Sequence, residues 1–224
     1  MQLTPDQQTH FRTERYAILN DIRWGVFLSL GIPIAGKTIF EPGAGIGDQT
    51  EWLLMQGAKH IYVNDGRKEN MDTIMARFGN DLRLTYCLGD LEKCLGTPEF
   101  QFEADLVFLW GVYYHINDQF GDFPVMRGLS RIAPTVVFEY LSCPANDTTF
   151  YGYDNVSTSL SQYAIRPTEK TMMDGLKKVW GYAYLPKAQM NWDDPCAPGT
   201  PRRIAVGSRV PVVAEGIVEY QTMP

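Results

Sequence analysis

The stretch from Thr38 to Gln49, TIFEPGAGIGDQ, constrains the fold more than any other part of the chain. A short β-branched and aromatic run ends in an acid, Glu41, and glycines follow at positions 43, 45 and 47. This order predicts a strand, a tight turn and a helix start, because glycine adopts positive φ and lets a ligand approach bare backbone. The amide groups at such a helix start can bind a nucleotide-like ligand.

The spacing of these glycines separates two classes of nucleotide site. A dinucleotide-binding turn follows the pattern G-x-G-x-x-G. Counted from Gly43, its third glycine would fall at position 48, which is Asp48. The glycines instead follow G-x-G-x-G, with an acid two residues before the first. The turn is therefore not typical of a nicotinamide-dependent enzyme.

Apolar runs and helical patterns alternate along most of the chain and predict an α/β fold. The predicted strands are Thr38–Glu41, His60–Asn64, Leu82–Cys87, Asp105–Trp110, Thr135–Tyr140, Tyr182–Leu185 and Arg203–Arg209. The predicted helices are Pro5–Asn20, Asp21–Leu30, Asp48–Gln56, Lys68–Phe78, Phe120–Ile132 and Thr168–Val179. Such alternation predicts a doubly wound sheet with helices on both faces.

Two segments lack this periodicity. Residues 141–166 are rich in Tyr, Asn, Asp, Ser and Thr, and residues 187–201 are rich in Pro and Asp. Irregular segments of this length in compact domains are commonly functional or disordered. We expect the first of them to lie near a bound substrate.

Acidic residues follow the second and third predicted strands, where open α/β sheets bind their ligands. Asp65 lies about 20 residues after the glycine turn, a position from which an acid can accept hydrogen bonds from ribose hydroxyls. Asp90 follows the third strand, where a carboxylate can accept from an adenine amino group while the next N–H meets a ring nitrogen. Taken alone, either residue is also typical of a turn or a helix cap.

Taken together, EPGAGIG, NDG, GDL and LWGVYYHI resemble the ordered motifs of the class I S-adenosylmethionine (SAM) methyltransferases. The resemblance covers residues 37–209. It implies a seven-stranded, mostly parallel sheet with an antiparallel last strand and a lid formed by the opening helices. We therefore expect a single domain, divided into a helical lid (residues 1–34), a Rossmann-like core (37–209) and a C-terminal tail (210–224).

The resemblance also assigns roles to the motif residues. The acid and glycines of the first motif would surround the methionine moiety of SAM, the acid after the second strand would bind the ribose, and the acid after the third would lie near adenine. The expected cofactor-binding set is Glu41, Gly43, Gly45, Gly47, Asp65, Gly66, Asp90, Leu91 and Trp110. The implied cofactor is SAM, and the product is S-adenosylhomocysteine (SAH).

Methyl transfer from a sulfonium is an in-line displacement, so the protein mainly positions and desolvates the reactants. A base is needed only where the acceptor carries a proton of high pKa. His115 is the first candidate base, because histidine titrates near neutral pH and this one follows the fourth strand. Glu139, at the end of the fifth strand, and Tyr113 complete the candidate catalytic set. Each has a structural alternative as a packing, hydrogen-bonding or capping residue.

Tyrosines in the segments expected near the acceptor could form the walls of its pocket. The candidate acceptor-binding residues are Tyr16, Tyr114 and Tyr151. The alternative is that tyrosines simply cover the edge of the sheet. Arg202 and Arg203 are interpreted as ordinary flanks of a strand, although a basic rim formed with Lys187 could bind an acidic acceptor.

Composition narrows the choice of partner. The formal net charge of −6 argues against a nucleic-acid partner, which would require a basic surface. The four cysteines form no C-x-x-C pair and the three histidines are far apart, so neither a metal site nor a disulfide framework is expected. The polar N-terminus and the absence of a long apolar window predict no membrane segment and a soluble, cytoplasmic protein.

We therefore expect a SAM-dependent enzyme that methylates an oxygen or nitrogen of a small molecule. A tRNA- or protein-modifying SAM-dependent enzyme is the alternative that the LWGVYYHI segment favours. A Rossmann-like binding protein without methyltransferase activity is the third possibility.

Overall fold

The computed structural model describes residues 3–116, 118, 123–143, 150–153, 163–190, 192 and 201–221. Its α-helices are α1 (Pro5–Phe11), α2 (Glu14–Leu30), α3 (Asp48–Met55), α4 (Lys68–Phe78), α5 (Leu91–Cys94), α6 (Pro124–Ile132) and α7 (Glu169–Trp180). Short 3₁₀ helices span Pro98–Phe100 (η1) and Tyr113–His115 (η2). In this part of the chain, no helix is long and apolar enough to cross a membrane.

One large sheet organises the molecule, with strand order β10-β8-β9-β5-β4-β1-β2-β3. Its strands are β1 (Thr38–Pro42), β2 (His60–Asp65), β3 (Leu84–Leu88), β4 (Leu106–Leu109), β5 (Thr135–Leu141), β8 (Tyr182–Pro186), β9 (Arg202–Ser208) and β10 (Ile217–Glu219). The first five are parallel, and β9 runs antiparallel to β5. The predicted fold class is thus confirmed. The added eighth strand, β10, lies within the expected tail.

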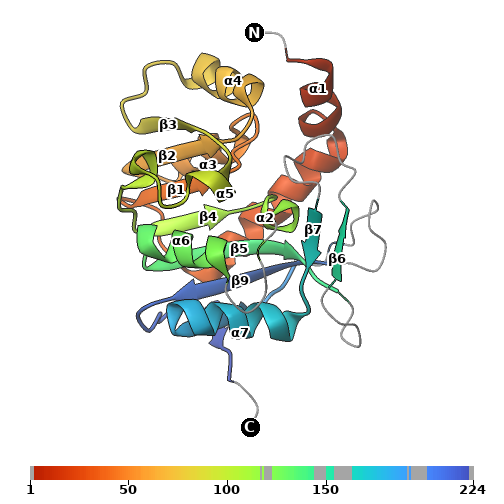
Figure 1. The fold of residues 1–224 in the computed structure, drawn as a ribbon, viewed down its shortest axis with the longest axis vertical. Coiled ribbons are helices and arrows are strands. Elements are labelled where there is room, and N and C mark those ends of the chain that lie inside the picture. Colours follow the sequence, from red (N-terminus) through yellow and green to blue (C-terminus); the bar gives the residue numbers. More distant parts are fainter. Residues whose placement is uncertain are drawn as a thin grey trace.

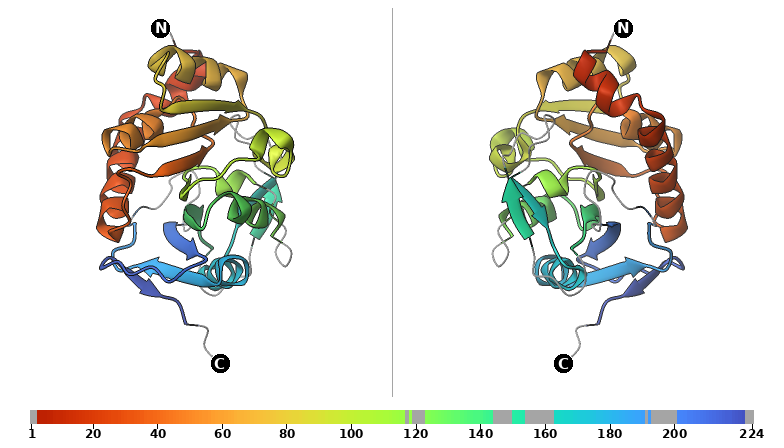
Figure 2. Two further views of the ribbon diagram at one scale, coloured as in Figure 1. Left: turned by 90° about the vertical axis from the view of Figure 1, so that its left-hand side faces the viewer. Right: turned by 90° about the vertical axis from the view of Figure 1, so that its right-hand side faces the viewer.

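Helices cover both faces of the sheet, as Figure 2 shows. Helices α2, α3 and α4 share one apolar cluster with the sheet, and α5, α6 and α7 share the other. Strand β4 shows the reason, because Val107 and Leu109 face the second cluster while Leu106 and Phe108 face the first. A strand that is buried on both faces consists of consecutive apolar residues, and this pattern predicted β4 from the sequence.

The opening helices break near Thr13 rather than at the predicted position 20. Thr4 and Gln7 form a reciprocal capping box at the start of α1. The Thr13 side chain then accepts a hydrogen bond from the Tyr16 N–H and starts α2. Gly31 ends α2 in the left-handed conformation, with φ of 73°. Helix α1 is therefore a separate element with its own contacts.

A small antiparallel hairpin, β6 (Phe150–Tyr153) and β7 (Tyr163–Arg166), lies within the segment expected to be irregular. Cys143, after β5, and Pro167, after β7, are joined by a hydrogen bond in which the Cys143 N–H donates to the Pro167 carbonyl at 3.0 Å. In Figure 1, β4 and β5 point toward the side of the molecule where α1, β6 and β7 lie. These elements therefore flank the carboxyl edge of the parallel strands.

Candidate cofactor and acceptor site

The glycine turn between β1 and α3 holds its three glycines in conformations that other residues rarely adopt. Gly43, Gly45 and Gly47 have φ of 67°, 61° and 84°. Gly47 is also the N-cap of α3, and no side chain caps that helix start. The turn therefore presents backbone at the carboxyl edge of β1, as the sequence predicts.

Side chains from three other elements close over this turn. A Cβ atom at Gly45 would lie 2.9 Å from Cε1 of Phe11 in α1, and one at Gly47 would lie 2.7 Å from Cε2 of Phe78 in α4. A Cβ at Gly43 would collide with the side chain of Val112, which follows β4. The glycines thus make room for the protein's own side chains, and their room for a ligand stays a prediction.

Glu41, at the end of β1, is a buried acid with half of its hydrogen-bonding capacity in use. The Thr50 hydroxyl donates to Oε2 at 2.7 Å. Oε1 has no hydrogen-bond partner within the described part of the protein. Burial raises the pKa of Glu41 from 4.5 to about 8. A buried carboxyl oxygen without a donor fits a ligand that brings an N–H group to the turn.

Asp65 links the second motif to the first. Its Oδ2 accepts from the Gly45 N–H at 2.8 Å, and its Oδ1 accepts from the Arg67 N–H at 2.8 Å and from Asn70 Nδ2 at 3.2 Å. Burial raises the pKa of Asp65, and these hydrogen bonds oppose that shift. Asp65, which is predicted to bind the ribose, therefore helps to fix the conformation of the glycine turn.

The end of β3 is held beside Asp65 by Asn64, the first residue of the NDG motif. Asn64 Nδ2 donates to the carbonyl oxygens of Cys87 and Gly89, each at 2.8 Å. The next residue, Asp90, accepts from the Glu92 N–H at 3.1 Å and caps α5. The capping role considered for Asp90 is thus present in the structure, whereas its contact with adenine stays a prediction.

The other two residues expected near the nucleoside lie close by. Gly66 directly follows Asp65 and is half-buried, while the Leu91 side chain is buried in the apolar cluster shared with α6 and α7. Only the backbone of Leu91 is therefore suited to meet a ligand.

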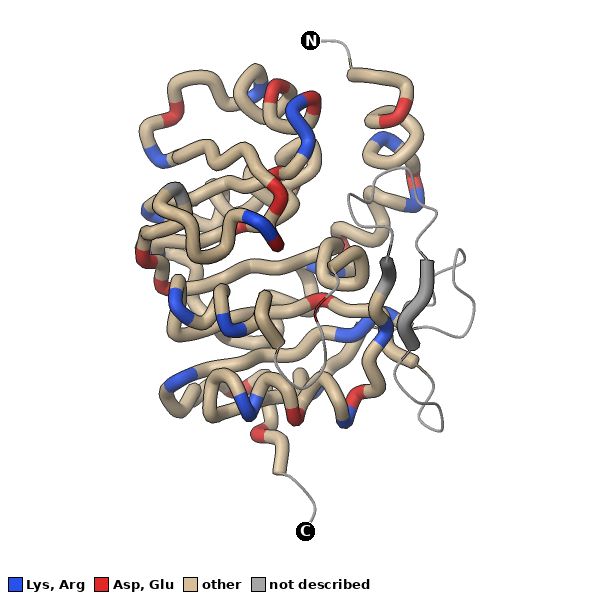
Figure 3. The backbone as a smooth tube through the Cα atoms, viewed as in Figure 1, with Lys and Arg blue, Asp and Glu red and all other residues tan. Residues whose placement is uncertain are grey.

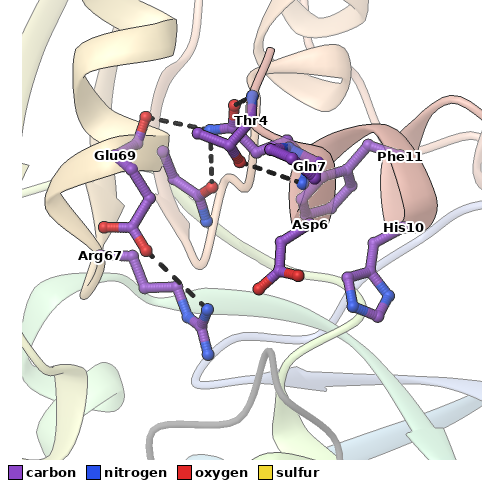
Figure 4. Close-up of a pocket in the computed structure, with 9 residues that line it drawn as sticks. Thr4, Asp6, Gln7, His10, Phe11, Arg67 and Glu69 are labelled. Carbon is purple, nitrogen blue, oxygen red and sulfur yellow. Dashed lines mark hydrogen bonds and ion pairs between the residues drawn. The ribbon is translucent and has the colours of Figure 1, made fainter.

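Helix α1 and the start of α4 enclose a pocket of about 390 Å³ beside these motifs. Gln7 joins the two helices, because its Nε2 donates to the Glu69 carbonyl at 3.0 Å and to Thr73 Oγ1 at 2.9 Å. Asp6, from α1, and Arg67, directly before α4, both line this pocket, as Figure 4 shows. Asn70 lines it and also contacts Asp65, so the pocket borders the expected ribose position.

A buried ion cluster lies beside Gly111, and the next residue, Val112, packs against Gly43 of the glycine turn. Glu139 in β5 accepts from Arg23 Nη2 at 3.1 and 2.7 Å and from Arg202 Nη1 at 2.9 Å. Burial raises the pKa of Glu139, but the two guanidinium groups together hold it below its ordinary value. This environment favours the hydrogen-bonding role considered for Glu139, because a carboxylate so stabilised in its charged form is a poor proton acceptor, and its role as a base stays a prediction.

Two further predicted residues belong to the core. Tyr113 is fully buried, packs edge-on against Phe138 and donates its hydroxyl to Asp118 Oδ2 at 3.2 Å. The Trp110 ring is buried and stacks on Phe108, with centroids 4.5 Å apart. Both side chains thus have packing roles in the structure, while the part of Tyr113 in catalysis and the contact of Trp110 with the cofactor stay predictions.

The remaining acceptor-side predictions come together around the ion cluster. The Tyr114 hydroxyl accepts from Arg202 Nη1 at 3.1 Å, and the Arg23 guanidinium lies 5.8 Å from the centre of the Tyr16 ring. Burial raises the pKa of Tyr16 to about 12, so its hydroxyl stays protonated at neutral pH. His115 is half-buried, with its ring centroid 4.3 Å from that of Tyr114.

Tyr151 lies in β6, but its side chain is outside the described residues, so its role stays a prediction.

The arginines of the ion cluster are what sequence reasoning missed. The sequence predicts Arg202 only as the flank of a strand, which it is, and assigns no role to Arg23. Asn20 precedes Arg23 by three residues on one face of α2, accepts from Arg23 Nη1 at 3.0 Å, and accepts from Gln49 Nε2 at 2.8 Å. A polar pair three residues apart on the buried face of a helix indicates a buried polar contact, and this pattern was present in the sequence.

Among the described residues, no group of three or more His, Cys, Asp or Glu side chains could hold a metal ion. The chemistry available at this edge of the sheet is that of buried carboxyls, guanidinium groups, phenols and backbone amides.

Comparison with known proteins identifies the fold. No protein-family model and no curated protein sequence matches the chain. Solved structures of methyltransferases, in contrast, match the chain. The N-terminal domain of EvdMO1, crystallised with SAH and D-fucose, is 16% identical with a TM-score of 0.63, over 84% of this chain and 81% of that domain. The chain has the fold of the class I SAM-dependent methyltransferases.

Two other enzymes share this methyltransferase fold. The 1,6-didemethyltoxoflavin-N1-methyltransferase of Burkholderia thailandensis, with its substrate and SAH bound, is 13% identical with a TM-score of 0.63, over 90% of this chain and 83% of that one. Magnesium protoporphyrin IX methyltransferase of Synechocystis, with SAM bound, is 16% identical with a TM-score of 0.58, over 93% and 86% of the two chains. At such identities the likeness establishes the fold alone.

Proposed function

We propose that this protein is a SAM-dependent methyltransferase that acts on an oxygen or nitrogen of a small molecule. The main support for the proposal is the hydrogen bond that joins the EPGAGIG turn to Asp65 of the NDG motif. The Asp65 carboxylate accepts the Gly45 N–H within a turn of three positive-φ glycines, and the neighbouring buried Glu41 keeps an oxygen without a donor. A generic structural turn does not need a buried acid with spare hydrogen-bonding capacity.

These residues fit SAM in the following way. Glu41 Oε1 and the backbone of Gly43 and Gly45 would hold the amino-acid part, Asp65 the ribose hydroxyls, and the Asp90–Leu91 turn the adenine. When bound, SAM supplies a methyl group that its sulfonium charge already activates. The protein contributes orientation and exclusion of water, and Phe11 of α1, packed over Gly45, is placed to exclude water from the turn.

A small-molecule acceptor is supported by the distribution of charge and by the kind of enzyme that shares the fold. Lys and Arg are interspersed with Asp and Glu along the described chain, as Figure 3 shows. A nucleic-acid substrate calls for a basic stripe instead. The two enzymes above are named for small-molecule substrates, 1,6-didemethyltoxoflavin and magnesium protoporphyrin IX, and the rings of Tyr16 and Tyr114 offer flat surfaces on which an aromatic acceptor could stack.

His115 is the base that we assign where the acceptor must lose a proton. It ends η2, the short helix after β4, is half-buried and lies beside Tyr114 in the proposed acceptor region. His115→Gln should lower kcat for a phenolic acceptor most strongly below that acceptor's own pKa, and should have a small effect on an acceptor that is already ionised. A uniform loss at every pH would instead indicate a packing role.

The test of the proposed function is calorimetric titration of the purified protein with SAM and with SAH, followed by incubation with methyl-labelled SAM and a metabolite panel. We expect both ligands to bind and at least one metabolite to acquire label. Failure to bind either ligand would refute the proposal. A matched pair of variants checks the site. Gly45→Val should abolish SAH binding, whereas Gly36→Ala, also at a positive φ but with open space around its Cβ, should not.

A further inference from the structure

Asn64 and Asp65, the last two residues of β2, each bind both the glycine turn and the turn after β3. The Asn64 carbonyl accepts from the Ala44 N–H at 2.9 Å, and its side-chain Nδ2 donates to the Gly89 carbonyl at 2.8 Å. Asp65 has the opposite arrangement, because its side chain accepts from the Gly45 N–H at 2.8 Å and its carbonyl accepts from the Gly89 N–H at 3.0 Å. The two turns are therefore joined through the backbone and the side chain of two neighbouring residues.

The ladder of hydrogen bonds between β2 and β3 explains why a side-chain donor is needed here. In the parallel register of these strands, the Arg67 N–H is the backbone donor in line with the Gly89 carbonyl. That N–H donates to Asp65 Oδ1 at 2.8 Å. The amide of Asn64 supplies the donor for Gly89 at the end of the ladder.

The orientation of the Asn64 amide follows from its partners. Nδ2 lies 2.8 Å from the carbonyl oxygens of both Cys87 and Gly89, and a carbonyl oxygen can only accept a hydrogen bond. The NH₂ group therefore uses both of its N–H bonds on the end of β3. Asn64 is 1% exposed, so loss of its side chain would leave buried carbonyl groups without this donor.

Helix α5 packs against the same turn. A Cβ atom at Gly89 would collide with Sγ of Cys94 and lie 3.9 Å from its Cβ. The next residue, Asp90, accepts from the Glu92 N–H at 3.1 Å and starts α5. The position of Asp90 therefore depends on where Gly89 is held by Asn64 and Cys94.

We propose that Asn64 is a positioning residue that makes the cofactor site selective for an adenine base. The inference rests on the proposed function and deepens it, because it takes the Asp90–Leu91 turn as the adenine subsite. A hydrogen bond from the adenine amino group requires the Asp90 carboxylate at a fixed place, and a displacement of about 1 Å can cost ~100-fold. Asn64 sets that place relative to the glycine turn, which binds the other end of the same ligand.

The competing explanation is that Asn64 only satisfies two buried carbonyl groups and adds stability. A comparison of two ligands separates the explanations. S-Inosylhomocysteine differs from SAH in its purine alone, where a carbonyl oxygen and a ring N–H replace the amino group and a ring nitrogen. Lost stability would weaken the binding of both ligands alike, whereas a displaced turn would weaken the binding of SAH selectively.

The experiment is calorimetric titration of the whole chain with SAH and with S-inosylhomocysteine. The wild type should bind SAH at least ~30-fold more tightly, because the analogue presents an acceptor oxygen to the Asp90 carboxylate. Asn64→Leu removes both side-chain hydrogen bonds at similar volume. It should lower the affinity for SAH about tenfold and change that for the analogue by no more than about twofold. Asn64→Asp can donate one hydrogen bond when protonated, so its preference for SAH should lie between those of Asn64→Leu and the wild type.

Gln189→Leu is the matched control. Gln189 Nε2 donates to the Ile204 carbonyl at 2.8 Å, and its Oε1 accepts from the Ile204 N–H at 3.0 Å. Ile204 lies in β9, which four strands separate from β3 in the sheet. This variant also loses two hydrogen bonds between a side-chain amide and a strand, and it should keep the preference of the wild type for SAH.

The possible outcomes are distinct. If SAH does not bind to the wild type, the proposed function fails, and the inference about Asn64 fails with it. If SAH binds but is not preferred over S-inosylhomocysteine, or if Asn64→Leu weakens both ligands equally, the inference is overturned while the proposed function stands. Should Asn64→Leu fail to fold, judged by its circular dichroism, Asn64→Asp decides the question by the same comparison.

Discussion

The buried acid Glu41 makes the stability of the ligand-free protein fall as pH rises. Burial raises its pKa from 4.5 to about 8 in the folded state. Below about pH 4.5 the carboxyl is protonated in both the folded and the unfolded chain, so it has no pH-dependent effect. Between the two pKa values the folded chain keeps a proton that the unfolded chain releases, and rising pH therefore favours unfolding. Above about pH 8 the penalty is complete.

The size of this effect follows from the width of the window. Each pH unit between the two pKa values changes the free energy of unfolding by ~1.4 kcal/mol, so Glu41 should cost the folded state about 3 kcal/mol between pH 5 and pH 7. Glu41→Gln keeps the hydrogen bond with Thr50 and does not titrate. The variant should therefore become more stable than the wild type as pH rises, by about that amount over the same interval.

Urea unfolding of both proteins at pH 5, 6, 7 and 8 measures this difference, with Glu103→Gln as the exposed control. Other groups that titrate in the window, such as Asp118, whose pKa burial raises to about 6, cancel when variant and wild type are compared. A difference between Glu41→Gln and wild type that stays constant over this range would refute the raised pKa.

The same proton links stability to binding. If the ammonium group of SAH reaches Glu41, its positive charge lowers the pKa of this carboxyl, and binding near pH 7 must release a proton. Calorimetry in two buffers of different ionisation enthalpy should detect that proton in the wild type, and it should be absent in Glu41→Gln.

Three further predictions test the site. Asp65→Asn should weaken SAH binding 10- to 100-fold, in line with the loss of charged hydrogen bonds, and Asp72→Asn on the surface of α4 should not, as calorimetry would show. Equal affinity in both variants would contradict the role of Asp65. Gly45→Ala should cost about 1–3 kcal/mol of stability because of its positive φ, and it should weaken SAH binding because its Cβ would press against Phe11. Phe11→Ala added to it should restore part of that affinity by removing the contact with α1. An unchanged affinity in the double variant would mean that Phe11 does not limit the space. Tyr113→Phe should lower the free energy of unfolding by about 1 kcal/mol through loss of the bond to Asp118 and leave turnover unchanged. A large loss of turnover would return Tyr113 to the catalytic set.

Local patterns in the sequence predicted most of the fold. The β4 strand was recognisable because all four of its residues are buried and apolar. The glycine turn was recognisable because positive φ demands glycine at fixed spacing. The break between α1 and α2 was missed, although Thr4 with Gln7 and then Thr13 form the caps that mark it. Strand β10 was missed because three residues in an edge strand carry too little pattern to detect.

The acceptor side was less accessible to such reasoning because its contacts join distant residues. Glu139 lies 116 residues from Arg23 and 63 from Arg202 in sequence, and no local pattern reports that pairing. Without those partners, an acid at the end of a strand is equally compatible with a base, a ligand and a cap. The guanidinium groups favour a hydrogen-bonding role over that of a base, because they stabilise the carboxylate in its charged form.

The two halves of the site differ in charge, and this difference accounts for the placement of the polar residues. The cofactor side holds the acids Glu41 and Asp65, whose negative charge burial disfavours and which a cation would stabilise. The acceptor side holds Arg23 and Arg202, with a single carboxylate between them. The Gly111–Val112 segment separates the two. Under the proposed function, a donor that bears a sulfonium and an ammonium group would be stabilised by the acids of the first side and disfavoured by the arginines of the second. The difference in charge would then orient the donor within the site.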